Sequence, residues 1–388
     1  MKKTTMLTAL AAALALGSAL PAAAETQGVT DTEVLIGSNQ DLSGIFAAFG
    51  APAVNAANLY FNEINEKGGV HGRTIRFIVE DHGYQMPKAM QGYNKLINSD
   101  KVFAMLLSLG TPVNLAGFKL QDPKNIANVA PLTAARQMNE PLHPLHFAGF
   151  SSYFDQIRIG ATFLAKQRAE VKEICTMTLP TDFGLEIVEG AKAAATENGL
   201  TFKAETTHKP DENDFVGALT KLKDEGCDVV AMALGVRQAI TAYATARKIG
   251  WTDADFIGSS AGFHTAMAQV PGGVTTGLYA AAGWVDLATR MDNAAVKEFA
   301  EKYQAAHGEF PGTGALLGRS AAETMVRALE AAGKDLTSES FIKGMESLNF
   351  EDEIAGVKVD YSAEDHKGGD LVVISQVKDG AWIEVGRQ

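Results

Sequence analysis

The chain has 388 residues, and its 46 acidic residues outnumber the 34 Lys and Arg residues, for a formal net charge of −12 at pH 7. An acidic chain without a run of basic residues argues against nucleic acid and against an anionic membrane surface as partners. The length exceeds what one ordinary hydrophobic core accommodates, so we expect two lobes.

The N-terminus has the pattern of a secretory signal peptide. Lys2 and Lys3 precede an apolar run from Met6 to Leu20, and small residues up to Ala24 form a cleavage site. A membrane anchor is the alternative, but the apolar run is shorter than the roughly 20 residues of a spanning helix. We therefore expect residues 1–24 to be removed after Ala24 and the mature chain to be exported to the periplasm.

The two cysteines, Cys175 and Cys227, have no neighbouring His or Cys with the spacing of a metal site. Both stand at starts of predicted strands that a doubly wound sheet could place side by side. A disulfide is therefore one reading, in an oxidising compartment. Two inert buried thiols are the reading that the sequence favours.

The first predicted elements form a strand, a helix and a strand. Residues 33–37 and 74–79 have strand patterns, and between them apolar residues recur at helical spacing from Val54 to Ile64. This order predicts two parallel strands joined by a right-handed crossover. The intervening loop, residues 38–52, is long and rich in Gly, Ser and small apolar residues. Open α/β sheets bind ligands at such loops, after the carboxyl ends of their strands.

The alternation continues in two series and then changes to helices and a closing set of strands. The first series continues with helices at 87–99 and 113–121, strands at 102–107 and 126–130, and an irregular loop at 138–144. The second has helices at 154–167, 184–199, 215–225, 237–249 and 263–269, and strands at 173–179, 201–207, 228–234, 255–258 and 277–282. Helices at 293–307, 318–332 and 338–348 and strands at 357–361, 371–377 and 382–385 follow. We predict an α/β protein of two doubly wound lobes.

Several motifs resemble those of the leucine/isoleucine/valine-binding proteins, which are type I periplasmic solute-binding proteins of ABC importers. They are the loop 42–44 leading to Phe49-Gly50, the run NEKGGVHG at 65–72, the turn 108–111, and Phe183-Gly184. The resemblance implies two lobes joined by three crossovers, with a ligand cleft that closes like a hinge. It places the first lobe at 25–149 and 284–350 and the second at 150–283 and 351–388. It also implies a monomer that works with membrane permease subunits.

The turn after the third predicted strand suits a carboxylate. Ser108 and Thr111 flank this turn, and a helix begins just after it. Hydroxyls and free backbone N–H groups at a helix N-terminus attract anions, although Ser or Thr there can simply cap the helix. The resemblance places the carboxylate on the matching serine and on a hydroxyl near Thr133. The residues expected at the cleft are Phe49, Ser108, Leu109, Thr111, Thr133, Phe183, Val236, Arg237, Ser260, Trp284 and Arg319.

The chain departs from the family at one position. Amino-acid binders are expected to hold the α-ammonium with an acidic residue after the strand that here ends at Gly258, but residues 259–262 contain no acid. A buried ammonium without a counter-charge is costly. Either Asp182 or Asp286 supplies the charge, or the ligand has no ammonium. Arg237 or Arg319 could instead bind a carboxylate bidentately, or each could bridge to a surface acid.

One stretch of the sequence also matches an enzyme motif. Residues 258–262 match G-x-S-x-G between a strand and a helix, with Ser260 as the nucleophile of a serine hydrolase. The partners would be Asp286 or Asp292 and His307 or His366. No oxyanion-hole motif precedes this stretch, no metal or nucleotide motif stands at a strand-to-helix junction, and the histidines lack ligand spacing.

We therefore predict a non-enzymatic binding protein without metal or cofactor. It would serve a branched-chain-amino-acid-type ABC importer and capture a small carboxylate-bearing solute, either an aromatic or aliphatic carboxylate or a hydrophobic amino acid. A ligand-sensing subunit of a signalling receptor is the alternative.

Overall fold

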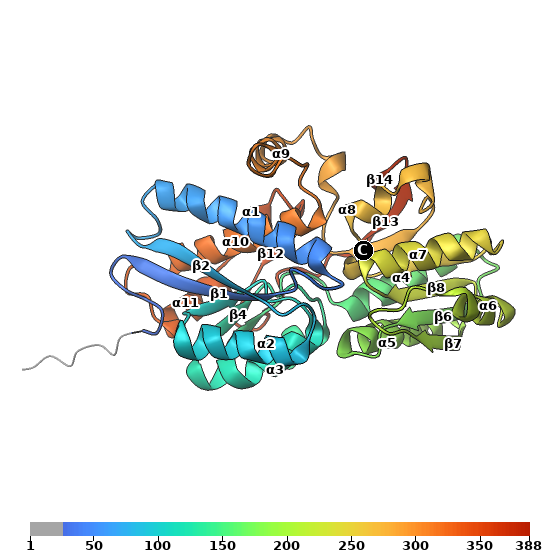
Figure 1. The fold of residues 1–388 in the computed structure, drawn as a ribbon, viewed down its shortest axis with the longest axis horizontal. Helices are drawn as coiled ribbons and strands as arrows, with labels where there is room; N and C mark the ends of the chain where they lie inside the picture. Colours follow the sequence, from blue (N-terminus) through green and yellow to red (C-terminus); the bar gives the residue numbers. More distant parts are fainter. Residues whose placement is uncertain (1–25) are drawn as a thin grey trace, which may run out of the picture.

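The computed structural model describes residues 26–388, which form two α/β lobes side by side (Figure 1). The predicted signal peptide lies outside these residues. Within residues 26–388, no helix has the length and apolar character needed to cross a membrane.

The first lobe contains a five-stranded sheet in the order β2-β1-β3-β4-β5, and every pairing in it is parallel. Its strands are β1 (Glu33–Gln40), β2 (Thr74–Asp81), β3 (Ala104–Leu106), β4 (Ala127–Val129) and β5 (His146–Phe147). The helices of this lobe are α1 (Ala47–Glu66), α2 (Met86–Asn94), the π-helical turn η1 (Lys95–Ser99), α3 (Thr111–Gln121), α10 (Thr313–Ala332) and α11 (Ser338–Glu346). The predicted parallel pair is present, because β1 and β2 align from Glu33 with Thr74 to Gln40 with Asp81.

The loop after β1 is shorter than the sequence predicts. β1 continues to Gln40 and α1 already begins at Ala47, so Gly50 and Pro52 lie inside the helix. These two residues are typical of loops, which is why the pattern concealed the first turns of α1. Gly50 is required by close packing, since a Cβ there would lie 2.2 Å from the carbonyl oxygen of Asp41. The tight turn brings the start of α1 against the second lobe.

The second lobe contains a seven-stranded sheet in the order β14-β13-β10-β9-β8-β6-β7. Its strands are β6 (Glu173–Thr178), β7 (Thr201–Thr207), β8 (Val229–Ala233), β9 (Asp255–Gly258), β10 (Tyr279–Ala282), β13 (Val373–Lys378) and β14 (Ala381–Arg387). Its helices are α4 (Tyr153–Gln167), α5 (Asp182–Asn198), α6 (Val216–Asp224), α7 (Val236–Lys248) and α8 (Thr265–Ala268). The pairings from β7 to β10 are parallel, and the β13–β14 hairpin adds to them antiparallel. The prediction of two α/β lobes is confirmed.

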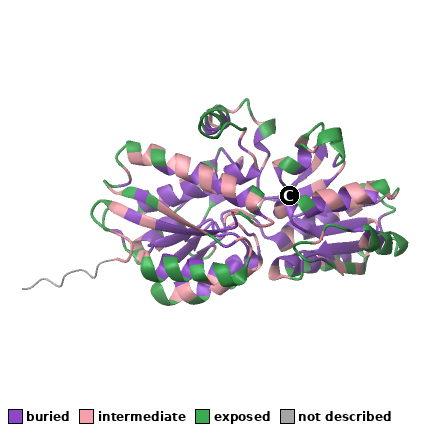
Figure 2. Ribbon diagram, in the orientation of Figure 1, coloured by how far each residue is buried: buried purple, intermediate pink, exposed green. Residues whose placement is uncertain are grey.

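Buried residues fill the centre of each sheet and the faces of the helices that cover it (Figure 2). β8, VVAMA, is buried at every position, as expected for a central parallel strand that is covered on both faces. Short helical turns complete the chain: η2 (Asp122–Lys124), η3 (Arg136–Met138), η4 (Ser260–Gly262), η5 (Pro271–Gly273) and η6 (Leu287–Thr289).

Cys175 and Cys227 form a disulfide, with their Cα atoms 5.8 Å apart. The two-thiol reading that the sequence favoured is therefore wrong. Cys175 lies in β6 and Cys227 just before β8, and these strands are neighbours in the sheet although 52 residues separate the cysteines. Only the strand order brings the two sulfur atoms together.

The third crossover differs from its expected position. The hairpin of β11 (Asn349–Asp352) and β12 (Val357–Asp360) follows α11, and Val359 and Tyr361 belong to the hydrophobic core of the first lobe. Tyr361 also donates a hydrogen bond to the carbonyl oxygen of Ala148, at 2.9 Å. The chain therefore enters the second sheet after Tyr361, whereas the resemblance placed the return at residue 350. The remaining helix, α9 (Ala294–His307), follows the second crossover.

Candidate ligand-binding site

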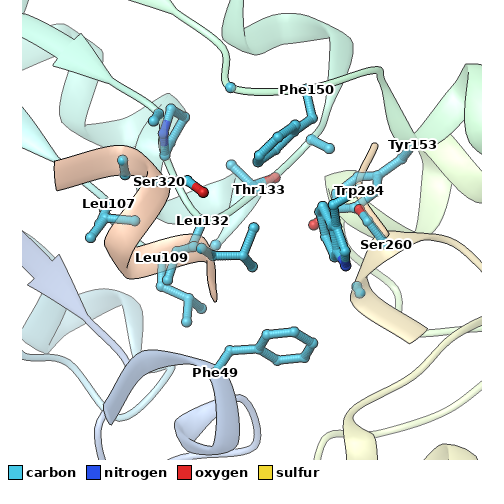
Figure 3. Close-up of a pocket in the computed structure, with 18 of the residues that line it drawn as sticks. Phe49, Leu107, Leu109, Leu132, Thr133, Phe150, Tyr153, Ser260, Trp284 and Ser320 are labelled. Atoms are coloured by element: carbon cyan, nitrogen blue, oxygen red, sulfur yellow. The ribbon is translucent and has the colours of Figure 1, made fainter. Parts of the chain in front are cut away.

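A cavity lies between the lobes, after the carboxyl ends of β3 and β4 in the first lobe and facing η4 and the start of α5 in the second (Figure 3). It contains about 910 Å³ of empty space, part of which is open to solvent. Its walls are mostly apolar and aromatic, with a few hydroxyl groups. The lining is typical of a site for a small organic ligand.

Two hydroxyl groups meet on the first-lobe side of this cavity. Thr111 Oγ1 and Thr133 Oγ1 are 2.7 Å apart, and both residues are buried. Thr111 is the first residue of α3, where backbone N–H groups have no acceptor within the helix. One hydroxyl donates to the other, so the pair keeps one proton to donate to a ligand. With the helix N-terminus, this arrangement suits a carboxylate oxygen.

Aromatic side chains form much of the wall. Phe49, Phe183 and Trp284 line the cavity at the positions expected from the sequence. Trp284 packs edge-on against Phe150, with ring centroids 5.3 Å apart, and within residues 26–388 its Nε1 has no hydrogen-bond partner. Tyr153 also lines the cavity, and burial raises the pKa of its hydroxyl to about 12, so it remains a hydrogen-bond donor at neutral pH.

Ser108 does not face the cavity, although the sequence made it the main carboxylate ligand. Its side chain is fully buried, and its Oγ accepts the backbone N–H of Asn39 at 3.3 Å. Leu107 and Leu109, on either side of it, line the cavity instead (Figure 3). Leu107 adopts a left-handed φ of 60° directly after β3, and this bend leaves the Ser108 side chain in the core and its two neighbours in the cavity wall. Leu109 is thus a wall residue, as expected, and Thr111 takes the polar position.

Neither predicted arginine reaches the cavity. Arg319 Nη1 is 2.7 Å from Glu323 Oε2, and its guanidinium lies 3.7 Å from the ring centroid of Tyr60. Arg237 is exposed on α7, and its neighbour Val236 is buried without lining the cavity. The cavity wall, within the described part of the chain, contains no Arg, Lys or His. Helix geometry explains the error, because Ser320 faces the cavity and Arg319, one residue before it on the helix, is rotated away from the cavity.

The acids proposed to replace the missing counter-charge also lie elsewhere. Asp286 accepts the N–H of Ala288 at 3.2 Å and that of Trp382 at 3.3 Å, and neither Asp286 nor Asp182 lines the cavity. The one carboxyl in the wall, among residues 26–388, is Asp352 at the end of β11. Sequence reasoning missed it because nothing local marks it as a site residue. Ser320 and Thr324 of α10 were also missed, although their spacing on one helical face could have suggested them.

Direct contacts hold the lobes together around the cavity. Thr265, from the second lobe, and Thr313, at the start of α10, exchange hydrogen bonds between backbone N–H groups and hydroxyls at 3.1 and 3.0 Å. Arg136 binds the buried carboxylate of Glu186 through its guanidinium at 2.8 Å and through its backbone N–H at 3.1 Å. The two lobes are therefore in direct contact beside the cavity.

Ser260 has no catalytic neighbours. It lines the cavity, and its backbone N–H donates to Gln156 Oε1 at 2.8 Å. Within residues 26–388 no histidine is hydrogen-bonded to its hydroxyl. Of the proposed partners, Asp292 and His307 are exposed, and His366 binds the backbone oxygens of His143 and His146. The geometry of a hydrolase triad is absent from the described residues.

One side-chain cluster away from the cavity has metal-ligand character. Asp122 Oδ1 is 2.9 Å from His146 Nε2, and Asp122 Oδ2 is 3.9 Å from His143 Nε2. However, His143 Nδ1 accepts the N–H of Leu145 at 3.3 Å, which leaves the proton of the neutral ring on Nε2. The ring would have to change tautomer and lose this bond before Nε2 could bind a metal.

A family model described as periplasmic binding protein matches residues 33–381. The chain belongs to the leucine/isoleucine/valine-binding family of periplasmic binding proteins. The resemblance in the motifs of the sequence is thereby confirmed, and with it the two-lobed type I fold.

Curated relatives of this family member are distant. A leucine-, isoleucine-, valine-, threonine- and alanine-binding protein of Pseudomonas aeruginosa is 22% identical over 351 residues, with 89% of this chain and 90% of the relative covered. An amino acid binding protein of the same species is 22% identical over 204 residues, and this match spans only 53% of the relative's length. The chain thus aligns with about half the length of the first curated relatives.

Solved structures share the fold over almost the whole chain. A fatty acid ABC transporter substrate-binding protein from Thermomonospora curvata is 26% identical, with a TM-score of 0.84 and 93% of both chains covered. A solute-binding protein from R. palustris in complex with benzoate is 20% identical, with a TM-score of 0.81 and 92% of this chain and 96% of the other covered. A branched-chain amino acid ABC transporter protein from Thermus thermophilus with bound valine is also 20% identical, with a TM-score of 0.82 and the same coverage.

Proposed function

We propose that this periplasmic binding protein is the solute receptor of an ABC importer and captures a small carboxylate with an apolar body. The observation that carries the proposal is the pair of buried hydroxyls at the N-terminus of α3, Thr111 and Thr133, in a cavity otherwise lined mainly by apolar and aromatic side chains. The lobes would close on the solute, with the first lobe binding the carboxylate and Phe183, Ser260 and Trp284 covering the apolar body.

The lining favours a solute without an α-ammonium group. A free amino acid needs an anionic partner for its ammonium, and Asp182 and Asp286 both lie outside the wall. The carboxyl that does line it, Asp352, already accepts two backbone N–H groups of its own hairpin. Aromatic and aliphatic carboxylates need no such partner. The relatives whose names include benzoate and fatty acid provide precedents for both kinds within the same fold.

Calorimetry on the mature chain, residues 25–388, refolded to remove carried-over ligand, tests this proposal. The ligands are benzoate, hexanoate, leucine and the amino-free analogue of leucine. The amides of benzoate and hexanoate are included for comparison. Acids should bind and the amides should bind at least tenfold more weakly. A ligand at 100 times its dissociation constant should also stabilise the fold by about 2.7 kcal/mol. Binding of leucine but not of its amino-free analogue would overturn the preference for ammonium-free solutes.

A double variant, T111V/T133V, serves as the matched control. Replacing both partners of a buried hydrogen bond with apolar groups of the same shape is nearly neutral for stability. The variant should therefore fold like the wild type and lose affinity for acids about tenfold, while its affinity for amides changes little. Unchanged acid binding in the double variant would place the carboxylate elsewhere.

The remaining expectations about the protein's role extend this proposal. Cleavage after Ala24, export, a monomeric state and delivery to permease subunits are supported by the sequence pattern at the N-terminus and by family membership. A sensing role in a signalling receptor needs the same closure on a ligand. Uptake of the identified solute by cells that lack this gene separates transport from sensing. Loss of accumulation would indicate a transport component, and unchanged accumulation would indicate a sensing role.

A further inference from the structure

The cavity continues past the threonine pair into the first lobe. There its wall consists of Leu107, Ala130, Val359 and Tyr361, which also belong to the hydrophobic core between the first sheet and α10. This inner end is bounded by α10 and by the β11–β12 hairpin. A solute that binds at Thr111 and Thr133 would therefore direct one part of its body into the first lobe.

The inner end is not wholly apolar. Ser320 of α10 is only 3% exposed, and within residues 26–388 its Oγ has no hydrogen-bond partner of acceptable geometry. Its hydroxyl oxygen points into the cavity (Figure 3). One turn further on, Thr324 lines the same region and donates its own hydroxyl proton to the carbonyl oxygen of Ser320, at 3.1 Å.

Asp352 brings a carboxyl group to the same place. It is 1% exposed, and its Oδ1 accepts the backbone N–H groups of Ile354 and Ala355, both at 2.9 Å. These bonds explain why an aspartate stands in the hairpin turn, but they use only one carboxyl oxygen. Burial raises the pKa of Asp352 above its usual value, and the N–H of Ala355 and the nearby Ser320 hydroxyl offset this rise only in part.

A wholly apolar solute would offer no hydrogen-bond partner to the Ser320 hydroxyl or to the second carboxyl oxygen of Asp352. A buried polar group without a hydrogen bond destabilises a folded protein, which is why such groups are rare. The role of Asp352 in the hairpin accounts for its Oδ1, but not for a Ser320 hydroxyl in the cavity wall that has no hydrogen-bond partner among residues 26–388. A hydroxyl group on the solute satisfies both residues, since it can accept from Ser320 and donate to Asp352.

We propose that the inner end of the cavity, formed by Ser320 and Asp352, binds a hydroxyl group at the end of the solute remote from its carboxylate. The solute class is then a hydroxylated aromatic or aliphatic carboxylate. This inference rests on the proposed function, because it takes the carboxylate to be bound at Thr111 and Thr133.

Calorimetry with matched ligand pairs tests the inference: benzoate with 3- and 4-hydroxybenzoate, and hexanoate with 6-hydroxyhexanoate. In at least one pair, the hydroxylated acid should bind wild-type protein about tenfold more tightly than its parent. The variant S320A should bring this ratio close to one without weakening the parent acid. Ser320 lies in a helix and its hydroxyl is unpaired, so alanine there should not impair folding.

Two further variants distinguish loss of the proposed hydroxyl site from a nonspecific effect of mutation on binding. S259A removes another buried hydroxyl that has no hydrogen-bond partner among residues 26–388 but lies outside the cavity wall, so it should leave the ratio unchanged. D352N keeps an oxygen for the N–H groups of Ile354 and Ala355, and it should reduce the ratio at least threefold while a thermal melt confirms folding. An equal ratio in wild type and S320A, or equal binding of parent and hydroxylated acids, would overturn the inference and leave the proposed function standing. If no acid binds, both fail.

Discussion

His264 Nε2 lies 2.9 Å from the carbonyl oxygen of Ala48 and links the second lobe to α1 of the first. Pro52 makes this bond available, because proline has no N–H to donate to the carbonyl four residues earlier in the helix. The other ring nitrogen of His264, Nδ1, accepts the N–H of Ala266 at 3.0 Å, which places the proton of the neutral ring on Nε2. His264 also packs edge-on against Phe49 of the cavity wall, with ring centroids 4.5 Å apart. The proline and the histidine together form a contact between the two lobes.

Replacing His264 with asparagine should weaken solute binding about fivefold, the effect of losing one hydrogen bond of about 1 kcal/mol. Asparagine can still cap the N–H of Ala266 but is too short to reach Ala48. Isothermal calorimetry with the best-binding acid measures the effect. The double variant P52A/H264N should recover part of the loss, since alanine gives α1 its own donor for this carbonyl. Equal affinity in H264N and wild type would show that the bond does not stabilise the closed form.

The stability of the protein should decrease as the pH falls below about 6.5, the ordinary pKa of histidine. Burial lowers the pKa of His82 and His264, so between the lowered values and 6.5 the unfolded chain binds more protons than the folded one. The free energy of unfolding then rises with pH in this window. Burial raises the pKa of Asp286 and Asp352. These groups oppose the trend at pH values just above the ordinary pKa of an aspartate, where the folded chain binds more protons than the unfolded one.

Urea unfolding at pH 5, 6, 7 and 8 measures this dependence. Comparing wild type with H264N isolates the histidine, because the aspartates are common to both proteins. The variant should lose less stability between pH 7 and pH 5 than the wild type does. An identical slope in both proteins would contradict the contribution of His264.

Replacing Trp284 with phenylalanine should lower the affinity for carboxylates about fivefold, provided that Nε1 donates to the solute. The variant retains the aromatic wall against Phe150, and it removes an N–H that has no partner among the described residues. Trp382 offers the contrast, because its Nε1 donates to the carbonyl oxygen of His264 at 3.0 Å. W382F should therefore cost roughly 1–3 kcal/mol of stability. A similar loss of stability in both variants, with unchanged affinity in W284F, would contradict this role.

Removing the disulfide should destabilise the second lobe. The bond closes a loop between residues 52 apart in the sequence, which corresponds to about 4 kcal/mol of stabilisation in the chain-entropy model. The variant C175A/C227A should unfold at a lower urea concentration than the oxidised protein. Reduced wild-type protein should behave like the variant. Equal stability of the oxidised and reduced forms would show that the bond adds nothing, and mass spectrometry of the exported protein checks that it forms.

Arg237 and Arg319 should not affect solute binding. Arg237 is exposed, and Arg319 is held by Glu323 and the Tyr60 ring outside the cavity. We expect R237A and R319M to bind every ligand within twofold of wild type. R319M should lose some stability, because it removes a contact with Tyr60 as well as the ion pair. A loss of carboxylate affinity in either variant would show that the arginine replaced in it contributes to solute binding.

Expectations that rest on local sequence patterns were mostly correct, and those that depend on contacts between distant segments were mostly wrong. Helices and strands were predictable because their apolar spacing is a local property, and the parallel pairing of β1 with β2 follows from the helix between them. α1 was an exception, because Gly50 and Pro52 have loop propensities that the packing of the two lobes overrides. Phe49, Thr133 and Trp284 stand at element ends, where an α/β sheet collects ligand residues, and they do line the cavity.

The polar groups of the site were harder to foresee. Whether Ser108 or Leu109 faces the cavity depends on the backbone direction after β3, which a single-residue shift reverses. Ser320 and Asp352 come from a helix and a hairpin that return to the first lobe after the second lobe is complete. Their position next to the cavity results from packing between segments far apart in the chain.

The alternation of apolar patterns in this sequence was enough to establish two α/β lobes, and its motifs were enough to indicate the binding-protein family. Both signals depend on residues close together in the sequence. The packing of the folded chain settled the pairing of Cys175 with Cys227 and the hydrogen bond from His264 to Ala48. It also settled the outward direction of Arg319 and the inward direction of Ser320. Each of these depends on which surfaces meet when distant segments bury their apolar faces, and a linear pattern contains no measure of that.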